Sequence, residues 1–166
     1  MLHIEDGGSA SGKSSYAESF AMSLQGEGRL LYIATMYPYK WNTTEIDPET
    51  MQRIERHRAM RADKGFDTVE CYRHVEHIVA KRQDVLLLEC MSNLLANEMY
   101  LEPDSNAGSD MAETMSPVSN KIVQALIDLS TRVQELVIVT NDVFSDGGSL
   151  TYDESTREYV KNLAEI

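Results

Sequence analysis

The sequence has few cationic side chains, few cysteines and no long apolar run, and each shortage excludes a class of protein. Lys and Arg number 15 against 27 Asp and Glu, which gives a formal net charge of −12. Such an acidic chain disfavours nucleic acid or an anionic membrane as its main partner. No apolar run is long enough to cross a bilayer, and no basic segment followed by an apolar stretch opens the chain. We therefore expect neither a membrane span nor a signal peptide.

Cysteine usage and composition predict a cytoplasmic globular protein. The two cysteines, Cys71 and Cys90, lie far apart and form no C-x-x-C pair, which is typical of buried, reduced thiols. The 166 residues are 42% hydrophobic and 25% charged, which suits a chain with a real core. Because no linker or internal repeat interrupts the sequence, we expect residues 1–166 to form a single domain.

Apolar runs and helical periodicity alternate along the chain. Continuous apolar runs at residues 2–4, 30–34, 85–88 and 136–140 predict buried parallel strands. Helical patterns over residues 15–24, 48–61, 72–81 and 118–132 lie between them, which predicts an α/β sheet. Residues 101–117 predict a surface loop, and residues 155–166 a further helix. Since a sheet of this type usually has one more strand that covers its edge, we expect a C-terminal helix and strand to be truncated.

A phosphate-binding loop is the most informative motif. Residues 7–14 read Gly-Gly-Ser-Ala-Ser-Gly-Lys-Ser, a complete G-x-x-x-x-G-K-[ST] motif between a predicted strand and a predicted helix. Glycines let backbone N–H groups surround an anion, and the helix adds the positive end of its dipole. We expect Lys13 to reach the β- and γ-phosphates and the Ser14 hydroxyl to bind Mg²⁺. The alternative is a Gly/Ser turn with a chance lysine.

A carboxylate follows the apolar run at residues 85–88. Glu89 stands at the carboxyl end of this predicted strand, which lies beside the phosphate loop in this class of fold. It could hold Mg²⁺ directly or through water. The alternative is a strand-terminal glutamate that only caps a neighbouring helix.

The predicted helix over residues 48–61 is unusually basic. Asp47 is a candidate N-cap, and Pro48 suits the first turn. His57 lies among four of the 15 basic residues, which are Arg53, Arg56, Arg58 and Arg61. Guanidinium groups match phosphate oxygens, and they disfavour a charged imidazole, leaving a nucleophile that can attack a nucleotide α-phosphate. From the residues alone, a solvated basic face is the alternative.

Six segments, taken in order over essentially the whole chain, resemble one enzyme family. They are residues 7–14, 32–35, 53–58, 68–70, 87–90 and 139–143. They resemble the bifunctional adenosylcobinamide kinase and adenosylcobinamide-phosphate guanylyltransferase of cobalamin biosynthesis, the CobU family. Many families share the phosphate loop, whereas Tyr-Ile-Ala-Thr followed by an Arg-Ile-x-x-His helix is far more specific.

The resemblance implies a P-loop NTPase-like (RecA-like), mostly parallel sheet flanked by helices, and two reactions. A nucleoside triphosphate, GTP or ATP, phosphorylates the hydroxyl of the aminopropanol arm of adenosylcobinamide. GTP then donates GMP to that phosphate through a guanylyl-histidine and releases pyrophosphate. The nucleophile falls on His57, Lys13 stabilises charge, Ser14 and Glu89 serve Mg²⁺, and the enzyme is a homotrimer.

Catalytic roles are thus expected for His57 and Lys13. The expected nucleotide-binding residues are Gly7, Gly8, Ser9, Ala10, Ser11, Gly12, Lys13, Ser14, Ser15, Arg53, Arg58, Arg61, Glu70, Glu89 and Asn141.

The chain also departs from the family pattern. Glu5 and Asp6 precede the loop, where two carboxylates would repel a triphosphate unless they point away or help to hold metal. Two alternatives stay open, of which the second is motivated by Glu5, Asp6 and the short C-terminus. Another phosphate-loop kinase would phosphorylate a different small molecule without a GMP adduct, and a degenerate nucleotide-binding subunit would bind nucleotide weakly and turn over nothing.

Overall fold

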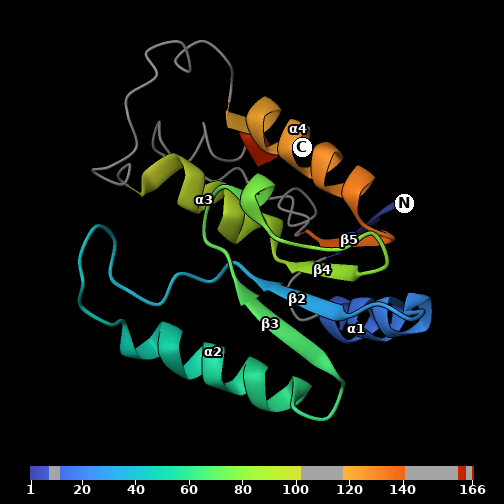
Figure 1. Ribbon diagram of the computed structural model, residues 1–166. Coiled ribbons are helices and arrows are strands. Elements are labelled where there is room, and N and C mark those ends of the chain that lie inside the picture. Colours follow the sequence, from blue (N-terminus) through green and yellow to red (C-terminus); the bar gives the residue numbers. More distant parts are fainter. Residues whose placement is uncertain (8–11, 102–117, 141–160, 164–165) are drawn as a thin grey trace.

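A single parallel sheet forms the centre of the molecule. The computed structural model describes residues 1–7, 12–101, 118–140, 161–163 and 166. Within these residues the sheet has the strand order β1-β5-β4-β2-β3, and all neighbouring pairs are parallel (Figure 1). The strands are β1 (Leu2–Glu5), β2 (Leu30–Ala34), β3 (Phe66–Glu70), β4 (Val85–Glu89) and β5 (Glu135–Val139).

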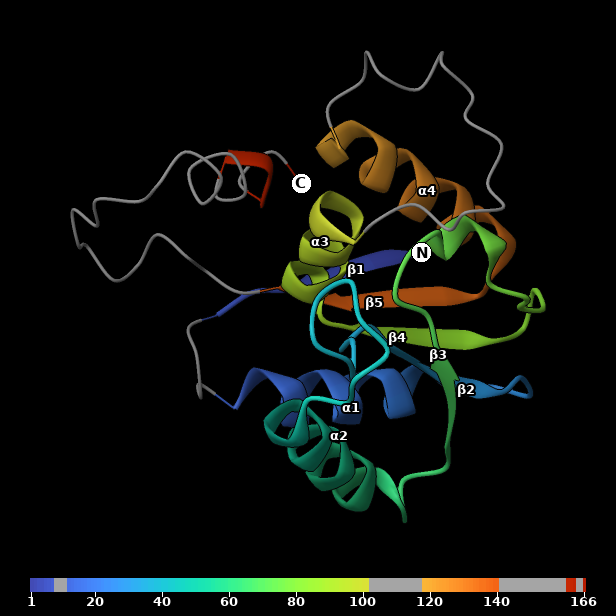
Figure 2. The ribbon, with the colours of Figure 1, turned by 90° about the vertical axis from the view of Figure 1, so that its left-hand side faces the viewer.

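Helices cover both faces of the sheet. Figures 1 and 2 show α1 and α2 on one face and α3 and α4 on the other. Their bounds are α1 (Lys13–Leu24), α2 (Pro48–Arg61), α3 (Met91–Tyr100) and α4 (Val118–Arg132), with a 3₁₀ turn, η1, at Val75–His77. No helix among the described residues is both long and apolar enough to traverse a membrane.

Alternate residues of the central strands supply two cores. Leu86 and Leu88 of β4 pack towards α3 and α4, whereas Val85 and Leu87 pack towards α1. The three central strands β2, β4 and β5 are buried almost throughout, because helices cover both of their faces. This explains why continuous apolar runs predicted them correctly, and the α/β architecture is confirmed.

The register brings the carboxyl ends of the strands into one line. Glu89 pairs with Val139 on one side and with Ala34 on the other, and Ala34 in turn pairs with Glu70. Loops and helices that follow these strands therefore meet at the same edge of the sheet, where ligands bind in open α/β sheets.

Two elements were not predicted, and one prediction was wrong. Strand β3 reads Phe-Asp-Thr-Val-Glu and lies at an edge, so it needs no apolar run, and α3 follows β4 after a single residue. No helix spans residues 72–81. That segment is a loop containing η1: His74 has a left-handed φ of +56°, and its N–H donates to Glu98 Oε1 (2.7 Å) of α3. Because a side chain satisfies this N–H, helical hydrogen bonding is not required there.

The structure describes both cysteines but only small parts of two predicted segments near the C-terminus. Cys71 and Cys90 are free thiols, as predicted, but each is half-buried. Burial raises the pKa of Cys71 to about 11. Most of the predicted 101–117 loop and of the predicted helix at residues 155–166 lies outside the described residues.

Candidate functional site

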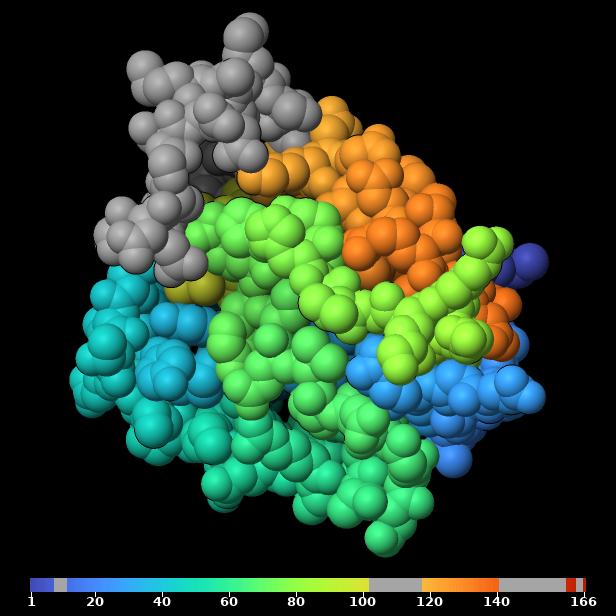
Figure 3. Space-filling view, viewed as in Figure 1, coloured from blue at the N-terminus to red at the C-terminus, as the bar shows by residue number. Residues whose placement is uncertain are grey.

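A cavity of about 220 Å³ lies at the carboxyl edge of the sheet, between α1, α2 and the strand ends. Figure 3 shows a small opening between α2 and β3 on one face of the molecule. The cavity wall contains eight of the predicted site residues, which are Lys13, Ser14, Arg53, His57, Arg58, Arg61, Glu70 and Glu89. The fold thus brings Lys13 and Ser14, at the end of the phosphate motif, together with the basic helix, which is far away in sequence.

The amino end of α1 forms one wall of this cavity. Gly12 precedes the helix with a left-handed φ of +83°, a conformation that strains any residue with a Cβ. Among the described residues, no side chain caps this helix, and its first turn holds no acidic residue. Because its first two residues, Lys13 and Ser14, line the cavity, the positive end of the helix dipole lies at the cavity wall.

The other residues of the predicted phosphate site either do not line the cavity or lie outside the described residues. Gly7, Gly12 and Ser15 are described but do not line the cavity. Glu5 and Asp6 do not line it either, and Asp6 Oδ1 accepts the N–H of Gly7 (2.7 Å). Four residues of the loop, Gly8, Ser9, Ala10 and Ser11, lie outside the described residues, as does Asn141.

Helix α2 begins as the sequence predicts. The Asp47 carboxylate accepts the N–H of Glu49 (3.3 Å) and the hydroxyl of Thr50 (2.6 Å), and Pro48 occupies the first turn. The hydrogen bond from Thr50 holds the pKa of Asp47 below its ordinary value. This cap fixes where the helix starts and therefore which residues share a face.

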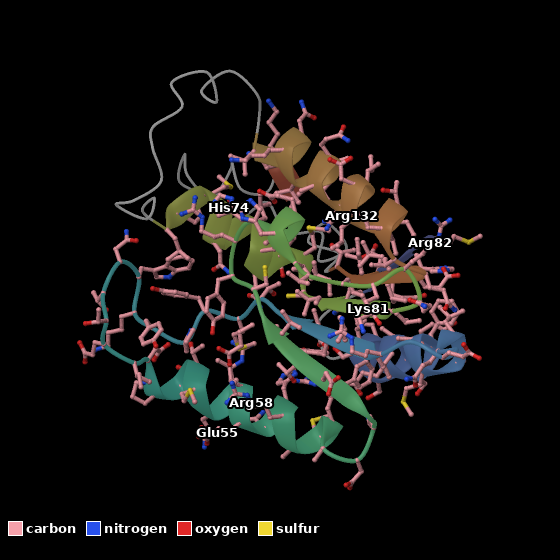
Figure 4. All side chains as sticks on the ribbon, in the orientation of Figure 1. Glu55, Arg58, His74, Lys81, Arg82 and Arg132 are labelled. Atoms are coloured by element: carbon pink, nitrogen blue, oxygen red, sulfur yellow. The ribbon has the colours of Figure 1, made fainter. Side chains whose placement is uncertain are left out.

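One face of α2 supplies the second wall. Arg53, His57 and Arg61 recur at four-residue intervals, with Ile54 and Arg58 beside them, so all five line the cavity. Figure 4 shows Arg58 between α2 and β3, with Glu55 on the helix beside it. Arg56, the remaining arginine of the helix, does not line the cavity.

Arg61 is the most unusual side chain of the site. It is only 6% exposed, and its Cζ lies 3.4 Å from the centroid of the Tyr32 ring. Its Nε and Nη1 are buried and have no hydrogen-bond partner among the residues that the structure describes. A buried unpartnered donor costs roughly 1–3 kcal/mol, and more when charged. An anion in the cavity could accept from these two groups.

Arg58 is already paired. Its Nη2 donates to Glu70 Oε1, and the Tyr72 hydroxyl donates to Glu70 Oε2 (3.0 Å). Burial, followed by the hydrogen bond to Glu70, raises the pKa of Tyr72. Because Arg58 and Glu70 are each about half exposed, at 45% and 48%, water screens the pair and a phosphate could displace the carboxylate.

Glu89 is held by its neighbours rather than used as a helix cap. Its Oε2 accepts the hydroxyl proton of Tyr32 (3.0 Å), and burial together with the Glu89 charge raises the pKa of Tyr32 well above its ordinary range. Helix α3 has Cys90 at its N-cap position and no side-chain cap. The helix-capping alternative for Glu89 is therefore not observed.

A buried threonine fixes the backbone after Glu89. Thr35 Oγ1 lies 3.0 Å from the carbonyl oxygens of both Glu89 and Cys90, and it accepts the N–H of Cys90 (2.8 Å). Thr35 is fully buried, so these hydrogen bonds at the junction between β4 and α3 are shielded from water. Ser92 and Asn93, in the first turn of α3, line the cavity as a result.

The donor set also bears on a metal. No cluster of three or more His, Cys, Asp or Glu ligands occurs in the part of the chain that the structure describes. Mg²⁺ usually takes one or two protein oxygens together with phosphate oxygens and water. Ser14 and Glu89, which line the same cavity, fit that requirement.

Sequence reasoning missed several lining residues. Tyr32, Thr68, Tyr72, Ser92 and Asn93 all line the cavity. Thr68 and Glu70 share a face of β3 because side chains alternate along a strand. Ser92 and Asn93 could have been predicted, because they are two polar residues that follow shortly after Glu89 at the carboxyl end of a predicted strand.

Comparison with protein-family models matches residues 5–166 to CobU, described as cobinamide kinase / cobinamide phosphate guanyltransferase. The chain belongs to the CobU family. No curated protein matches it. The predicted resemblance is confirmed over essentially the whole chain, and the P-loop NTPase-like fold with it. This CobU protein is a kinase and guanylyltransferase of cobalamin biosynthesis, whose substrates are a corrinoid and the nucleotides GTP or ATP.

Proposed function

We propose that the cavity at the sheet edge binds one guanine nucleotide and that His57 forms the covalent guanylyl intermediate. The observation that supports this is the common wall: Lys13 and Ser14 from α1, and His57 from α2, line the same cavity. Among the described residues of α2 that line the cavity, His57 is the only side chain with a nitrogen that can act as a nucleophile, because the others are three guanidinium groups and the apolar Ile54.

Guanylyl transfer then proceeds in two displacements. A ring nitrogen of His57 attacks the α-phosphorus of GTP, a P–N bond forms, and the bond to pyrophosphate breaks. A phosphate oxygen of adenosylcobinamide phosphate next attacks the same phosphorus, and the P–N bond breaks to restore the imidazole. Lys13 and Arg61 stabilise the charge that develops on the phosphate oxygens.

In the kinase reaction the phosphate loop holds the triphosphate. The hydroxyl of the aminopropanol arm gives up its proton to solvent and attacks the γ-phosphorus, and the bond from that phosphorus to the nucleoside diphosphate breaks. We assign nucleotide contacts to Arg53 and Arg58, the latter after exchange of its Glu70 partner for phosphate. Ser14 and Glu89 would hold Mg²⁺, which neutralises phosphate charge when bound.

The sequence predictions of the phosphate loop and of Asn141 remain proposals, as do the single domain, the homotrimer and the cytoplasmic location. Sedimentation equilibrium of the full chain at several concentrations tests the trimer.

Labelling with GTP tests whether His57 forms the guanylyl intermediate. Incubation with α-labelled GTP and Mg²⁺ should give an acid-labile, base-stable adduct in the wild-type chain, and His57→Ala should lose at least about 10³-fold of this label. His77→Ala, which removes a histidine outside the cavity, is the matched control and should keep it. Persistent label in His57→Ala would overturn the assignment.

A kinase assay separates the two reactions. Phosphorylation of adenosylcobinamide should survive in His57→Ala, because the γ-phosphoryl group passes directly to the hydroxyl, whereas Lys13→Ala should lose both activities. Loss of the kinase in His57→Ala with native circular dichroism would show that the histidine serves both steps and contradict the division proposed.

A further inference from the structure

Five aromatic rings form a connected cluster beside the site. We call Tyr37, Tyr39, Trp41, Tyr72 and Tyr100 the aromatic platform. The ring centroid of Tyr37 lies 5.4 Å from those of Tyr39 and Tyr72 and 6.2 Å from that of Trp41, and the Trp41 and Tyr100 centroids are 6.2 Å apart. The rings therefore run as a chain from β3 to the end of α3.

The outer rings of the platform face solvent. Trp41 is 51% exposed, Tyr39 38% and Tyr100 37%. Single exposed aromatics are ordinary, but a contiguous exposed patch marks a binding surface, because burying such rings is worth more than burying most other side chains.

The loop that carries the platform is preorganised. Tyr39 and Ile46 form an antiparallel bridge, the N–H of Lys40 donates to the carbonyl of Glu45 (2.9 Å), and their side chains form an ion pair (2.6 Å). Asn42 Nδ2 donates to the carbonyl of Tyr100 (3.4 Å), and this hydrogen bond connects the loop to the end of α3. In Figure 1 the loop is the blue segment that connects β2 to α2. A ligand would meet rings already in position, so little ordering entropy opposes binding.

The platform is continuous with the candidate site. A second cavity of about 380 Å³ is lined by Tyr37, Tyr39 and Trp41. It shares Met36, Arg53 and Asn93 with the site cavity. Tyr72 belongs to the platform and also lines the site cavity, so the two hollows adjoin along a wall of common residues.

The corrinoid substrate needs such a surface. Its reacting hydroxyl or phosphate sits at the end of a side arm, while the macrocycle is far too large to enter a 220 Å³ cavity together with a nucleotide. The ring must therefore rest outside the cavity, within reach of it. A flat, largely apolar macrocycle fringed with amides suits a platform of aromatic rings with Lys40, Thr50 and Asn93 in the adjoining wall.

We propose that the aromatic platform is the docking surface for the corrin ring of cobinamide, with the aminopropanol arm directed into the site cavity. This inference rests on the proposed function, because it takes that cavity as the place where the arm reacts.

Calorimetric titration with adenosylcobinamide, which requires no turnover, tests the platform directly. Trp41→Ala and Tyr39→Ala should each weaken binding by roughly five- to a hundredfold, by analogy with the loss of one aromatic ring that stacks on a nucleobase. Trp41→Phe should restore most of the affinity. Tyr16→Ala, which removes a 60% exposed ring on α1 outside both cavities, should leave it unchanged.

The GMP label distinguishes failure of this inference from failure of the proposed function. Trp41→Ala should retain the GMP label on His57, with a native circular dichroism spectrum. Unchanged adenosylcobinamide affinity in both alanine variants would overturn the platform. So would a loss of GTP affinity without a loss of corrinoid affinity, which would place the guanine base there. Absence of label in the wild-type chain would overturn the guanylyl-histidine and leave the corrinoid titration readable.

Discussion

The centre of the sheet and helix α2 differ in burial and in polarity. Strands β2, β4 and β5 are apolar and almost wholly buried, whereas Arg61 is the only buried residue among the 14 of α2. The sheet is stabilised by packing, while α2 contacts the rest of the molecule with charged and polar side chains. The contrast teaches that stability and chemistry are encoded separately here, although they meet at one edge of the sheet.

Truncation in the sheet should give the largest effect on stability. Leu86 is fully buried on the face towards α3 and α4, away from the site, so Leu86→Ala should lower the free energy of unfolding by about 3 kcal/mol. Met60→Ala on α2, which is 53% exposed, should change it by less than about 0.5 kcal/mol. Urea denaturation measures both, and equal losses would erase the contrast.

Arg61→Met should reverse the pattern, since this residue serves the site at the expense of the fold. Removing two buried unpartnered donors should leave stability unchanged or raise it, while GTP affinity falls by about ten- to a hundredfold, as expected for a lost charged hydrogen bond. Titration calorimetry and thermal unfolding give the two readouts. Arg56→Met, on the same helix but outside the cavity, should alter neither. An unfolded Arg61→Met chain would show instead that the guanidinium stabilises α2.

Acid sensitivity should come from the far end of the sheet and have the smallest effect. Asp84, 1% exposed at the start of β4, accepts from Arg29 Nη2 (2.6 Å) and from the N–H groups of Arg29 (3.0 Å) and Lys81 (2.8 Å). Burial raises its pKa, but these hydrogen bonds outweigh burial and lower it overall.

Since the folded pKa of Asp84 lies below the unfolded value of about 4, its stabilisation is complete above that value and is lost as pH falls through the folded pKa. Asp84→Asn should therefore flatten the fall in stability below about pH 5 and lower stability at neutral pH by about 1–2 kcal/mol. Urea denaturation from pH 7 to pH 3 checks this, with Asp128→Asn on α4 as control. An unchanged acid slope in Asp84→Asn would assign the acid sensitivity to other groups.

The same contrast explains how far the sequence could be read. Unbroken apolar runs predict the buried strands, and the Asp47 cap with Pro48 predicts the start of α2. These elements were therefore predicted to within about one residue. Strand β3 is polar because it lies at an edge, and residues 72–81 adopt a loop because a side chain from distant α3 satisfies the His74 N–H. Such tertiary contacts leave no local trace.

Site residues followed a similar division. Lys13, His57 and Glu89 belong to motifs whose chemistry is visible in the sequence, and the fold brings all three to one cavity. The pairing of Arg58 with Glu70 could not be foreseen, since it requires β3. The stacking of Arg61 on Tyr32 likewise depends on how the carboxyl end of α2 packs against β2.

The phosphate loop and His57 are proposed to act on one guanine nucleotide. Titration with a GTP analogue that cannot be cleaved between its α- and β-phosphates tests this proposal, with labelling of His57 by GTP followed at each degree of occupancy. We predict a single guanine site in each chain and a loss of label in proportion to its occupancy. A saturated chain that still labels His57 at the full rate, or a second analogue site that persists in Lys13→Ala, would contradict it.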